Sequence, residues 1–273
     1  MRYIAVVHTH YYTDPACPWS WALEPTLRRL LEELGDSLAI TYVMCGMRRE
    51  LEDPEQLALQ ALEAAAQSGM PVDARLWLQD PPVSSHPACI AVKAAAEQGD
   101  PGAYLRRLRE GLFCRRRKLD NADALTEEAR AAGGIDLERF GVDLRSHGAL
   151  EAFGADLERA KAVPAEHHAA GSERVKLPSL EFRDRDGAVH GVYGYSDYAT
   201  LRRAALAAGA VATAAAPPSI EQALGRWGSM ATVEVAAVCQ LPGPPAPSEL
   251  WRLAGEWRVK AERAGGGELW SPA

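Results

Sequence analysis

The sequence predicts an α/β fold in which a small sheet is interrupted by an inserted helical domain and followed by a C-terminal appendage. A β-branched run, an amphipathic helix and an alternating strand follow one another up to residue 44. A long stretch then carries only helical patterns, and strand-type alternation returns near residue 175. Sheet-forming segments on both sides of a helical stretch indicate one sheet with an insertion.

The first predicted strand covers residues 3–7 and extends through Tyr12, because the run is apolar and β-branched. Pro25 falls inside the next helical pattern and predicts a kink there. Residues 37–44 alternate as a second strand. The strand–helix–strand order predicts that the two strands pair in parallel. One face of the predicted helix carries Trp19, Leu23, Leu27, Leu30, Leu31 and Leu34.

The inserted helical domain is predicted over residues 51–171, where glycine and proline separate the helical patterns. The sheet-forming unit then comprises residues 1–50 and 172–212. In its second part, Asp184-Arg185-Asp186-Gly187 predicts the turn of a hairpin. The predicted helices of the insertion lie at 54–68, 72–79, 86–98, 101–113, 122–132 and 147–162; the hairpin strands lie at 175–182 and 188–193, and a last helix at 197–208.

A proline-containing linker, Ala214-Ala215-Ala216-Pro217-Pro218, precedes a C-terminal appendage over residues 217–273. Helices are predicted at 219–227, 231–240 and 248–263, and a short strand at 268–270. This order allows a winged-helix-like module, but DNA-binding modules are usually basic. Acidic residues outnumber basic ones from Ser219 onward. We therefore interpret the appendage as a packing or oligomerisation element.

Composition points to a globular protein of a reducing, cytoplasmic setting. The net charge of −7 argues against nucleic-acid binding, and no apolar run reaches the roughly 18 residues of a membrane span. Met1-Arg2 leads straight into the first predicted strand, unlike a secretory signal. The five cysteines are odd in number, and their spacing suggests no disulfide framework.

The most informative motif is Cys17-Pro18-Trp19-Ser20, between the first predicted strand and its helix. A thiol at a helix start is easily ionised, so we expect the pKa of Cys17 to lie below the ~8.5 of a free thiol. Ser20 cannot form an internal disulfide, although its hydroxyl can donate a hydrogen bond to the thiolate. The motif therefore predicts one-thiol chemistry through a mixed disulfide, and the alternative is a small packed cysteine.

The stretch from Thr13 to Trp21 resembles the active-site turn of the DsbA-like branch of the thioredoxin superfamily. That branch includes cytosolic FrnE-type oxidoreductases, kappa-class glutathione transferases and hydroxychromene-carboxylate isomerases. Residues 40–46 and 85–94 resemble a subgroup that contains a bacterial ClpXP adaptor. The resemblance covers roughly residues 1–210, and it implies a thioredoxin fold with a helical domain inserted between the second and third core strands.

Pro178 lies inside the strand pattern at residues 175–182, where a proline is normally confined to an edge or bulge. The resemblance implies that Pro178 follows a cis peptide bond and lies opposite the reactive thiol. We expect it in van der Waals contact with Cys17, with the backbone of Leu177 open to an extended substrate. The other predicted substrate contacts are Pro18, Trp19 and Trp21.

Two further cysteines are candidates for the site. Cys45 ends the second strand, so it should lie at the same sheet edge as Cys17 and could act as a remote resolving thiol. Cys89 is a candidate pocket residue, and for both cysteines the alternative is simple packing. His8 and His10 share a strand face, but no further ligands lie at matching spacing, so we predict no metal site.

Three functions remain open from the sequence. The first is a cytosolic one-thiol disulfide reductase or isomerase without a tightly bound cofactor, for which glutathione is a candidate co-substrate. The second is a kappa-type glutathione transferase or isomerase, in which Ser20 or Cys17 stabilises a bound thiolate. The third is a non-catalytic adaptor that holds a protein partner in the thioredoxin groove. The expected partners are therefore thiols, disulfides or a protein. We expect neither nucleic acid nor a membrane as a partner, and the oligomeric state stays open.

Overall fold

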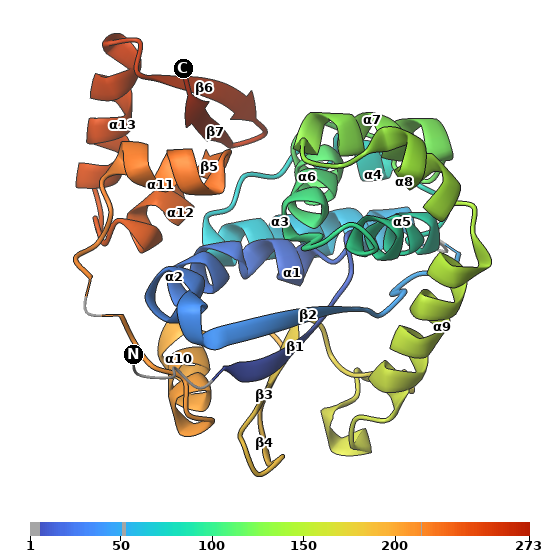
Figure 1. Cartoon of the computed structure of the whole chain (residues 1–273). Coiled ribbons are helices and arrows are strands. Elements are labelled where there is room, and N and C mark those ends of the chain that lie inside the picture. Colours follow the sequence, from blue (N-terminus) through green and yellow to red (C-terminus); the bar gives the residue numbers. More distant parts are fainter. Residues whose placement is uncertain (1–5, 51–52, 214) are drawn as a thin grey trace.

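The computed structural model describes residues 6–50, 53–213 and 215–273 (Figure 1). Its main sheet has the strand order β2-β1-β3-β4. β1 pairs in parallel with β2 and antiparallel with β3, which pairs antiparallel with β4. This strand–helix–strand unit with a returning hairpin is the thioredoxin arrangement that the resemblance implies. The bounds are β1 (Val7–Thr13), β2 (Leu38–Met44), β3 (Ser179–Arg183) and β4 (Val189–Tyr193); predicted strand residues 3–5 lie outside the described residues.

Helices on one face of this sheet build its main core. The active-site helix is divided into α1 (Pro18–Ala22) and α2 (Glu24–Leu34), with a break at Leu23 beside Pro25, where the kink was predicted. α10 (Tyr198–Ala207) packs beside α2, and the side chain of the preceding Asp197 caps its start. The shared core contains Tyr11, Leu23, Leu27, Leu30, Leu34, Leu180, Phe182 and Leu201.

The helices between residues 54 and 161 share a hydrophobic core with the rest of the chain: it includes Trp21 from the active-site helix and Ala231, Ala264 and Leu269 from the C-terminal appendage. Trp21 stacks on Phe113 with ring centroids 6.0 Å apart, and Trp77 lies 5.8 Å from Phe113. The short α8 escaped prediction because Phe140 is its only buried residue. The helices are α3 (Pro54–Ser68), α4 (Arg75–Gln79), α5 (His86–Ala96), α6 (Gly102–Phe113), α7 (Ala122–Ala132), α8 (Leu137–Asp143) and α9 (His147–Lys161); 3-10 turns lie at Gly35–Ser37 and Ala165–His167.

Residues 219–273 form a C-terminal module with a three-stranded sheet of order β5-β7-β6. The predicted helix at 248–263 is wrong beyond Gly255: the chain turns at Trp257, whose φ is +60°, and then enters β6. Pairing of β6 with β7 prevails over the helical composition of this segment. The element order is that of a winged-helix module: α11 (Ile220–Trp227), β5 (Met230–Ala231), α12 (Thr232–Val238), α13 (Pro245–Gly255), β6 (Val259–Ala264) and β7 (Gly267–Pro272).

The C-terminal module packs against both other parts of the chain, beside α2 and on the opposite side of the molecule from α9 (Figure 1). Its β6–β7 turn approaches the loop before α4 so closely that a Cβ at Gly265 would lie 1.9 Å from the carbonyl oxygen of Val72. Gly265 also has a φ of +57°, which side chains rarely adopt. Glycine is therefore required at this contact. No helix in the described part of the chain is both long and apolar enough to span a membrane.

Candidate functional site

Cys17 is the N-cap residue of α1, four residues after the end of β1. Its N–H donates to the carbonyl oxygen of Asp14 at 3.2 Å, and Pro18 occupies the first helical position, where no N–H is needed. The side chain of Cys17 is only 2% exposed. The thiol therefore lies at the predicted position between strand and helix, but beneath the surface.

A directed chain of hydrogen bonds reaches Cys17 from the inserted domain. Arg109 of α6 donates to the hydroxyl of Thr13, which donates to Oγ of Ser20 at 2.9 Å. Ser20 in turn hydrogen-bonds to Cys17 through its side chain and its backbone. The role of Ser20 in one-thiol chemistry stays a prediction.

The expected low pKa of Cys17 is wrong for this structure. Burial raises the pKa of Cys17, and the neighbouring carboxyl of Asp14 adds to this rise. The hydrogen bonds from Ser20 and the charge of Arg109 act in the opposite direction without reversing it. The prediction considered the helix start alone, whereas removal of the thiolate from water is the larger effect here.

Asp14 is a buried acceptor that organises the turn before Cys17. One oxygen accepts from the N–H of Ala16 at 2.8 Å; the other accepts from the N–H of Met47 at 2.6 Å and the hydroxyl of Ser85 at 2.9 Å. Burial raises the pKa of Asp14, although these hydrogen bonds lower it. Asp14 stands within the quoted motif, but its role escaped the sequence because its donors come from two distant loops.

The two additional cysteines lie around this same turn. The N–H of Cys45 donates to the carbonyl oxygen of Thr13 at 2.9 Å, which puts it at the predicted sheet edge. The thiol of Cys89 donates to Asp14 at 3.4 Å. Both are buried, and burial raises the pKa of each well above its ordinary value. Neither thiol is activated, and the resolving role of Cys45 stays a prediction.

The register of the sheet brings the Pro178 segment to the end of β1. Tyr12 pairs with Ser179, so Pro178 immediately precedes β3 at the sheet end from which Cys17 follows. The peptide bond between Leu177 and Pro178 is cis. Leu177 is half-buried, as is Trp19, whose ring lies 5.4 Å from that of Tyr195. The contact between Pro178 and Cys17 stays a prediction.

Trp21 is wrong as a substrate contact. Its side chain is fully buried, and its indole N–H donates to the carbonyl oxygen of Pro71 at 2.9 Å. The guanidinium of Arg106 lies 4.3 Å from its ring centroid. The motif alone does not show which of Trp19 and Trp21 is buried, because packing of the inserted domain decides which face of α1 is covered.

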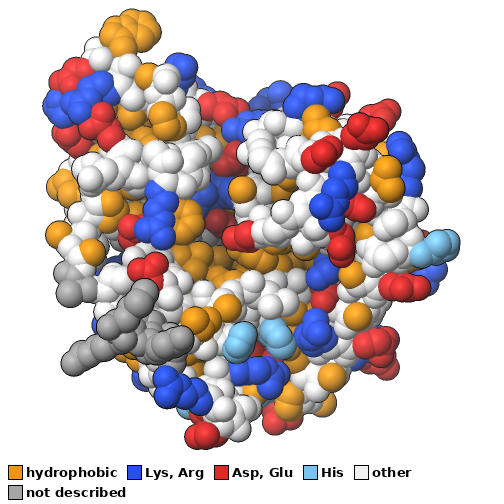
Figure 2. Space-filling view, in the orientation of Figure 1, with side chains coloured by type: hydrophobic (Ala, Val, Ile, Leu, Met, Phe, Trp, Pro, Cys, Tyr) orange, Lys and Arg blue, Asp and Glu red, His pale blue; other side chains and the backbone are white. Residues whose placement is uncertain are grey.

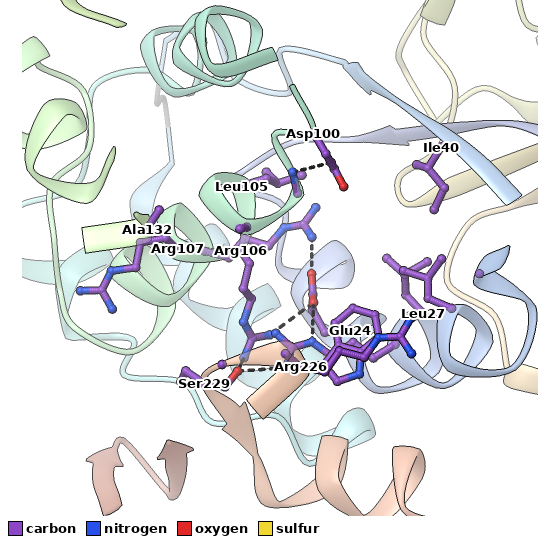
Figure 3. Close-up of a pocket in the computed structure, with 18 of the residues that line it drawn as sticks. Glu24, Leu27, Ile40, Asp100, Leu105, Arg106, Arg107, Ala132, Arg226 and Ser229 are labelled. Carbon is purple, nitrogen blue, oxygen red and sulfur yellow. Dashed lines mark hydrogen bonds and ion pairs between the residues drawn. The ribbon is translucent and has the colours of Figure 1, made fainter. Parts of the chain in front are cut away.

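Behind the active-site helix lies a buried ion network that joins all three parts of the chain. Glu24 of α2 lies at its centre, and Arg106 of α6 extends toward it (Figure 3). Arg109 also pairs with Glu24, and Arg28 lies 3.6 Å from it. Burial opposes ionisation of Glu24, but Arg109, Arg106 and Arg28 outweigh it and lower its pKa. One signal was available: Arg109 stands among Leu105, Leu108 and Leu112, on the apolar face of its predicted helix.

This network forms one wall of a cavity of about 790 Å³ between α2, β2, α6 and the end of α11. Figure 2 shows a hollow below the helical domain with hydrophobic side chains in it. Its lining does not include Cys17 or Pro178. Among its arginines, Arg106 and Arg109 pair with Glu24, and Arg226 pairs with Glu32 at 3.1 Å. Cationic groups in this cavity are therefore already engaged, which disfavours it as a site for glutathione carboxylates.

Metal-binding side chains do not gather in the described ranges 6–50, 53–213 and 215–273: no three His, Cys, Asp or Glu lie together in a suitable arrangement. His8 is exposed, whereas His10 is half-buried with Nδ1 4.0 Å from Glu181. Burial lowers the pKa of His10. These histidines share the predicted strand face without further ligands.

Comparisons with known proteins agree with this architecture. The chain is 29% identical over 276 residues to the ClpXP adapter protein SpxH of Halalkalibacterium halodurans, covering 95% of this chain and 86% of that protein. It is 28% identical to the ClpXP adapter protein SpxH of Bacillus subtilis, covering 96% and 87%. The cytosolic disulfide reductase DsbM from Pseudomonas aeruginosa has a similar fold, with a TM-score of 0.54 and 21% identity over 68% of this chain and 88% of that one. A family model described as thioredoxin matches residues 10–169. Because this match spans more than half of the chain, the protein belongs to that thioredoxin family.

Proposed function

We propose that this protein is a cytoplasmic adaptor that binds a protein partner and presents it to the ClpXP protease. The observation that carries this proposal is the extent of the similarity. Four relatives named ClpXP adapter SpxH match 95–96% of the chain and four others match 71%, whereas the DsbM match covers 68%. The larger coverage favours a function that uses the C-terminal module together with the thioredoxin-like part.

The state of Cys17 also favours a binding role over thiol chemistry. The thiol is 2% exposed, burial raises its pKa, and Ser20 cannot serve as a second thiol. An adaptor needs no thiolate, so these properties are compatible with it. We place the partner contact at Trp19 and Leu177, two half-buried apolar side chains at the end of the sheet where Cys17 follows β1.

The test begins with protein half-lives in cells that lack this chain and in cells that lack ClpX. Proteins stabilised in both strains are then purified and incubated with ClpXP. We expect at least one to be degraded faster when this chain is added, and Cys17→Ala to stimulate as well as the wild type. Trp19→Ala should reduce the stimulation, while Leu78→Ala, an exposed leucine of α4, should not. Equal degradation with and without this chain for every such protein would overturn the proposal.

A one-thiol disulfide reductase is the second candidate, favoured by the hydrogen bonds from Ser20 to Cys17. After deprotonation, Cys17 would attack one sulfur of a disulfide, form a mixed disulfide and release the other sulfur as a thiolate. A glutathione thiolate would then attack the substrate sulfur of the mixed disulfide and release Cys17, and a second glutathione would release the substrate thiol and form glutathione disulfide. Reduction of hydroxyethyl disulfide by glutathione tests this candidate. Activity that Cys17→Ser abolishes supports it, and a rate equal to glutathione alone rejects it.

A further inference from the structure

The C-terminal module places one carboxylate inside the rest of the molecule. Glu234 of α12 is fully buried and accepts two hydrogen bonds from Arg106, at 2.9 Å and 2.8 Å. Nε of Arg28 lies 3.2 Å from the same carboxylate. The N–H of Ala231 donates to it at 2.6 Å, so the start of α12 fixes the side chain from behind. Glu234 is thus held rigidly at the junction of the module with α2 and α6.

A continuous path leads from this carboxylate to the Cys17 site. Arg106 contacts Glu24 at 3.3 Å, and Glu24 pairs with Arg109. Arg109 donates to Thr13, from which the hydrogen-bond chain continues to Ser20 and Cys17. Each contact holds the next group in place, so the position of Arg109 depends on how strongly Glu24 is drawn to the arginines near Glu234.

Docking of the module adds the negative charge of Glu234 to the network. The network includes three carboxylates, Glu24, Glu110 and Glu234, and three guanidinium groups, Arg28, Arg106 and Arg109; Arg107 and Arg115 also pair with Glu110. Loss of the Glu234 charge with the module still in place adds an excess of positive charge on the side from which Arg109 faces Cys17. Charge in a buried site is weakly screened, so this excess favours a thiolate.

We propose that Glu234 is a positioning residue through which docking of the C-terminal module keeps the Cys17 thiol unreactive. Loss of this docking frees Glu24 to move toward Arg28 and Arg106, leaves the charge of Arg109 less neutralised by Glu24, and so makes Cys17 a better nucleophile. By linkage, deprotonation of Cys17 weakens docking of the module by the same factor by which release of the module favours deprotonation. The inference does not depend on the adaptor role, because it concerns only the coupling of these two regions.

The groups that face Cys17 come from several elements, and those named here lie outside the module. Asp14 precedes α1, Tyr11 lies on β1, Cys45 follows β2, and Arg109 projects from α6. Asp14 raises the pKa of Cys17 and Arg109 lowers it. A change at Glu234 therefore alters the pKa of Cys17 through Arg109, while the effects of Asp14, Tyr11 and Cys45 on this pKa stay the same.

Gly265 offers a second way to disturb docking without altering any charge. A Cβ there would collide with the carbonyl oxygen of Val72, and the positive φ adds strain. The adjacent Gly266 has open space around it, so Gly266→Ala is a matched control. For charge, the control is Glu249→Gln, since Glu249 lies exposed in the same module.

The test alkylates the full-length chain with isotopically labelled iodoacetamide at several pH values between 6 and 10. Mass spectrometry of the peptide that contains Cys17 then measures how fast this thiol reacts. For Glu234→Gln we expect the pKa of Cys17 to fall by about one unit, which increases the thiolate fraction at neutral pH about tenfold. A thiolate of lower pKa is also a weaker nucleophile, so the alkylation rate should rise only about threefold. Gly265→Ala should also accelerate alkylation, while Gly266→Ala and Glu249→Gln should match the wild type.

The double variant Glu234→Gln with Arg28→Gln removes one negative and one positive group, so the net charge of the network is that of the wild type. It should return the alkylation profile toward the wild type, which nonspecific unfolding would not do. Tryptophan fluorescence and limited proteolysis at the linker report whether the module is docked in each variant. The proposal would be overturned if the alkylation profile of Cys17 were unchanged in Glu234→Gln, or in a Gly265→Ala protein whose module is shown to be released. It would also be overturned if the double variant were as reactive as Glu234→Gln.

Discussion

Asp14 and Glu24 are two buried carboxyl groups at opposite ends of the same short segment, and burial affects them with opposite outcomes. Asp14 is compensated by hydrogen bonds from backbone and hydroxyl donors, and burial raises its pKa. Glu24 has Arg28, Arg106 and Arg109 around it, and these lower its pKa despite equal burial. Hydrogen bonds alone do not offset desolvation here, whereas opposite charges do.

Cys17 lies between these two environments and is influenced by both. Asp14 on one side opposes ionisation of the thiol, and Arg109 on the other favours it. The buried position of Cys17 decides the outcome, since desolvation is the largest contribution. A thioredoxin-like active-site turn can therefore keep its cysteine in place without keeping it reactive.

The largest effect is expected when the charged region is broken at its centre. Glu24→Gln removes the carboxylate shared by three arginines and leaves them buried with too few partners. Loss of one member of a buried ion network typically costs about 3–5 kcal/mol. Urea unfolding measures this as a fall in the free energy of unfolding. Glu249→Gln, at an exposed pair, should leave it nearly unchanged; a similar small change for Glu24→Gln would show that the network contributes little.

The sequence predicts the framework of this region but not its charge balance. Strand–helix–strand order, the helix break near Pro25, and the bounds of α3 and α7 follow from local patterns. Cys17 and Ser20 follow from one motif. Arg109 and Glu234 are separated from Glu24 by long stretches of chain, so only the docking of α6 and α12 brings them together. Burial of Cys17 depends on the same packing, which is why its pKa was predicted with the wrong sign.

A smaller effect is expected at the hydrogen-bonded end. Asp14→Asn turns one acceptor oxygen into an NH₂ group that faces donors from Met47 and Ser85. Leaving buried donors unsatisfied costs about 1–3 kcal/mol. Urea unfolding at pH 7 should show this loss, below that of Glu24→Gln. A loss as large as that of Glu24→Gln would mean that Asp14 has a strong positive partner, contrary to its surroundings.

The pH dependence of stability should separate the two carboxyls by sign. The raised folded pKa of Asp14 favours the folded state at low pH, and this contribution declines as the pH rises above the unfolded value of about 4. The lowered folded pKa of Glu24 stabilises the protein above about 4.3 and is lost as the pH falls. From pH 4 to 7, the stability difference between wild type and Asp14→Asn should shrink, and that for Glu24→Gln should grow. Parallel trends would refute the opposite pKa directions.

The smallest effect is expected at Ser20, where the two environments meet at the thiol. Ser20→Ala removes a hydroxyl that donates to Cys17, and an ordinary hydrogen bond contributes about 0.5–1.5 kcal/mol. Because 1.36 kcal/mol corresponds to one pKa unit, the alkylation midpoint of Cys17 should rise by up to about one unit. Iodoacetamide labelling against pH measures this midpoint, and Ser68→Ala is a control whose hydroxyl bonds only within α3 and its end. If the midpoint falls instead, the hydroxyl of Ser20 takes part only in the hydrogen bonds with Thr13 and Arg109 and does not stabilise the thiolate. The support that Arg109 gives to Cys17 would then be electrostatic alone, and the hydrogen-bonded link between the charged region and the thiol would be absent.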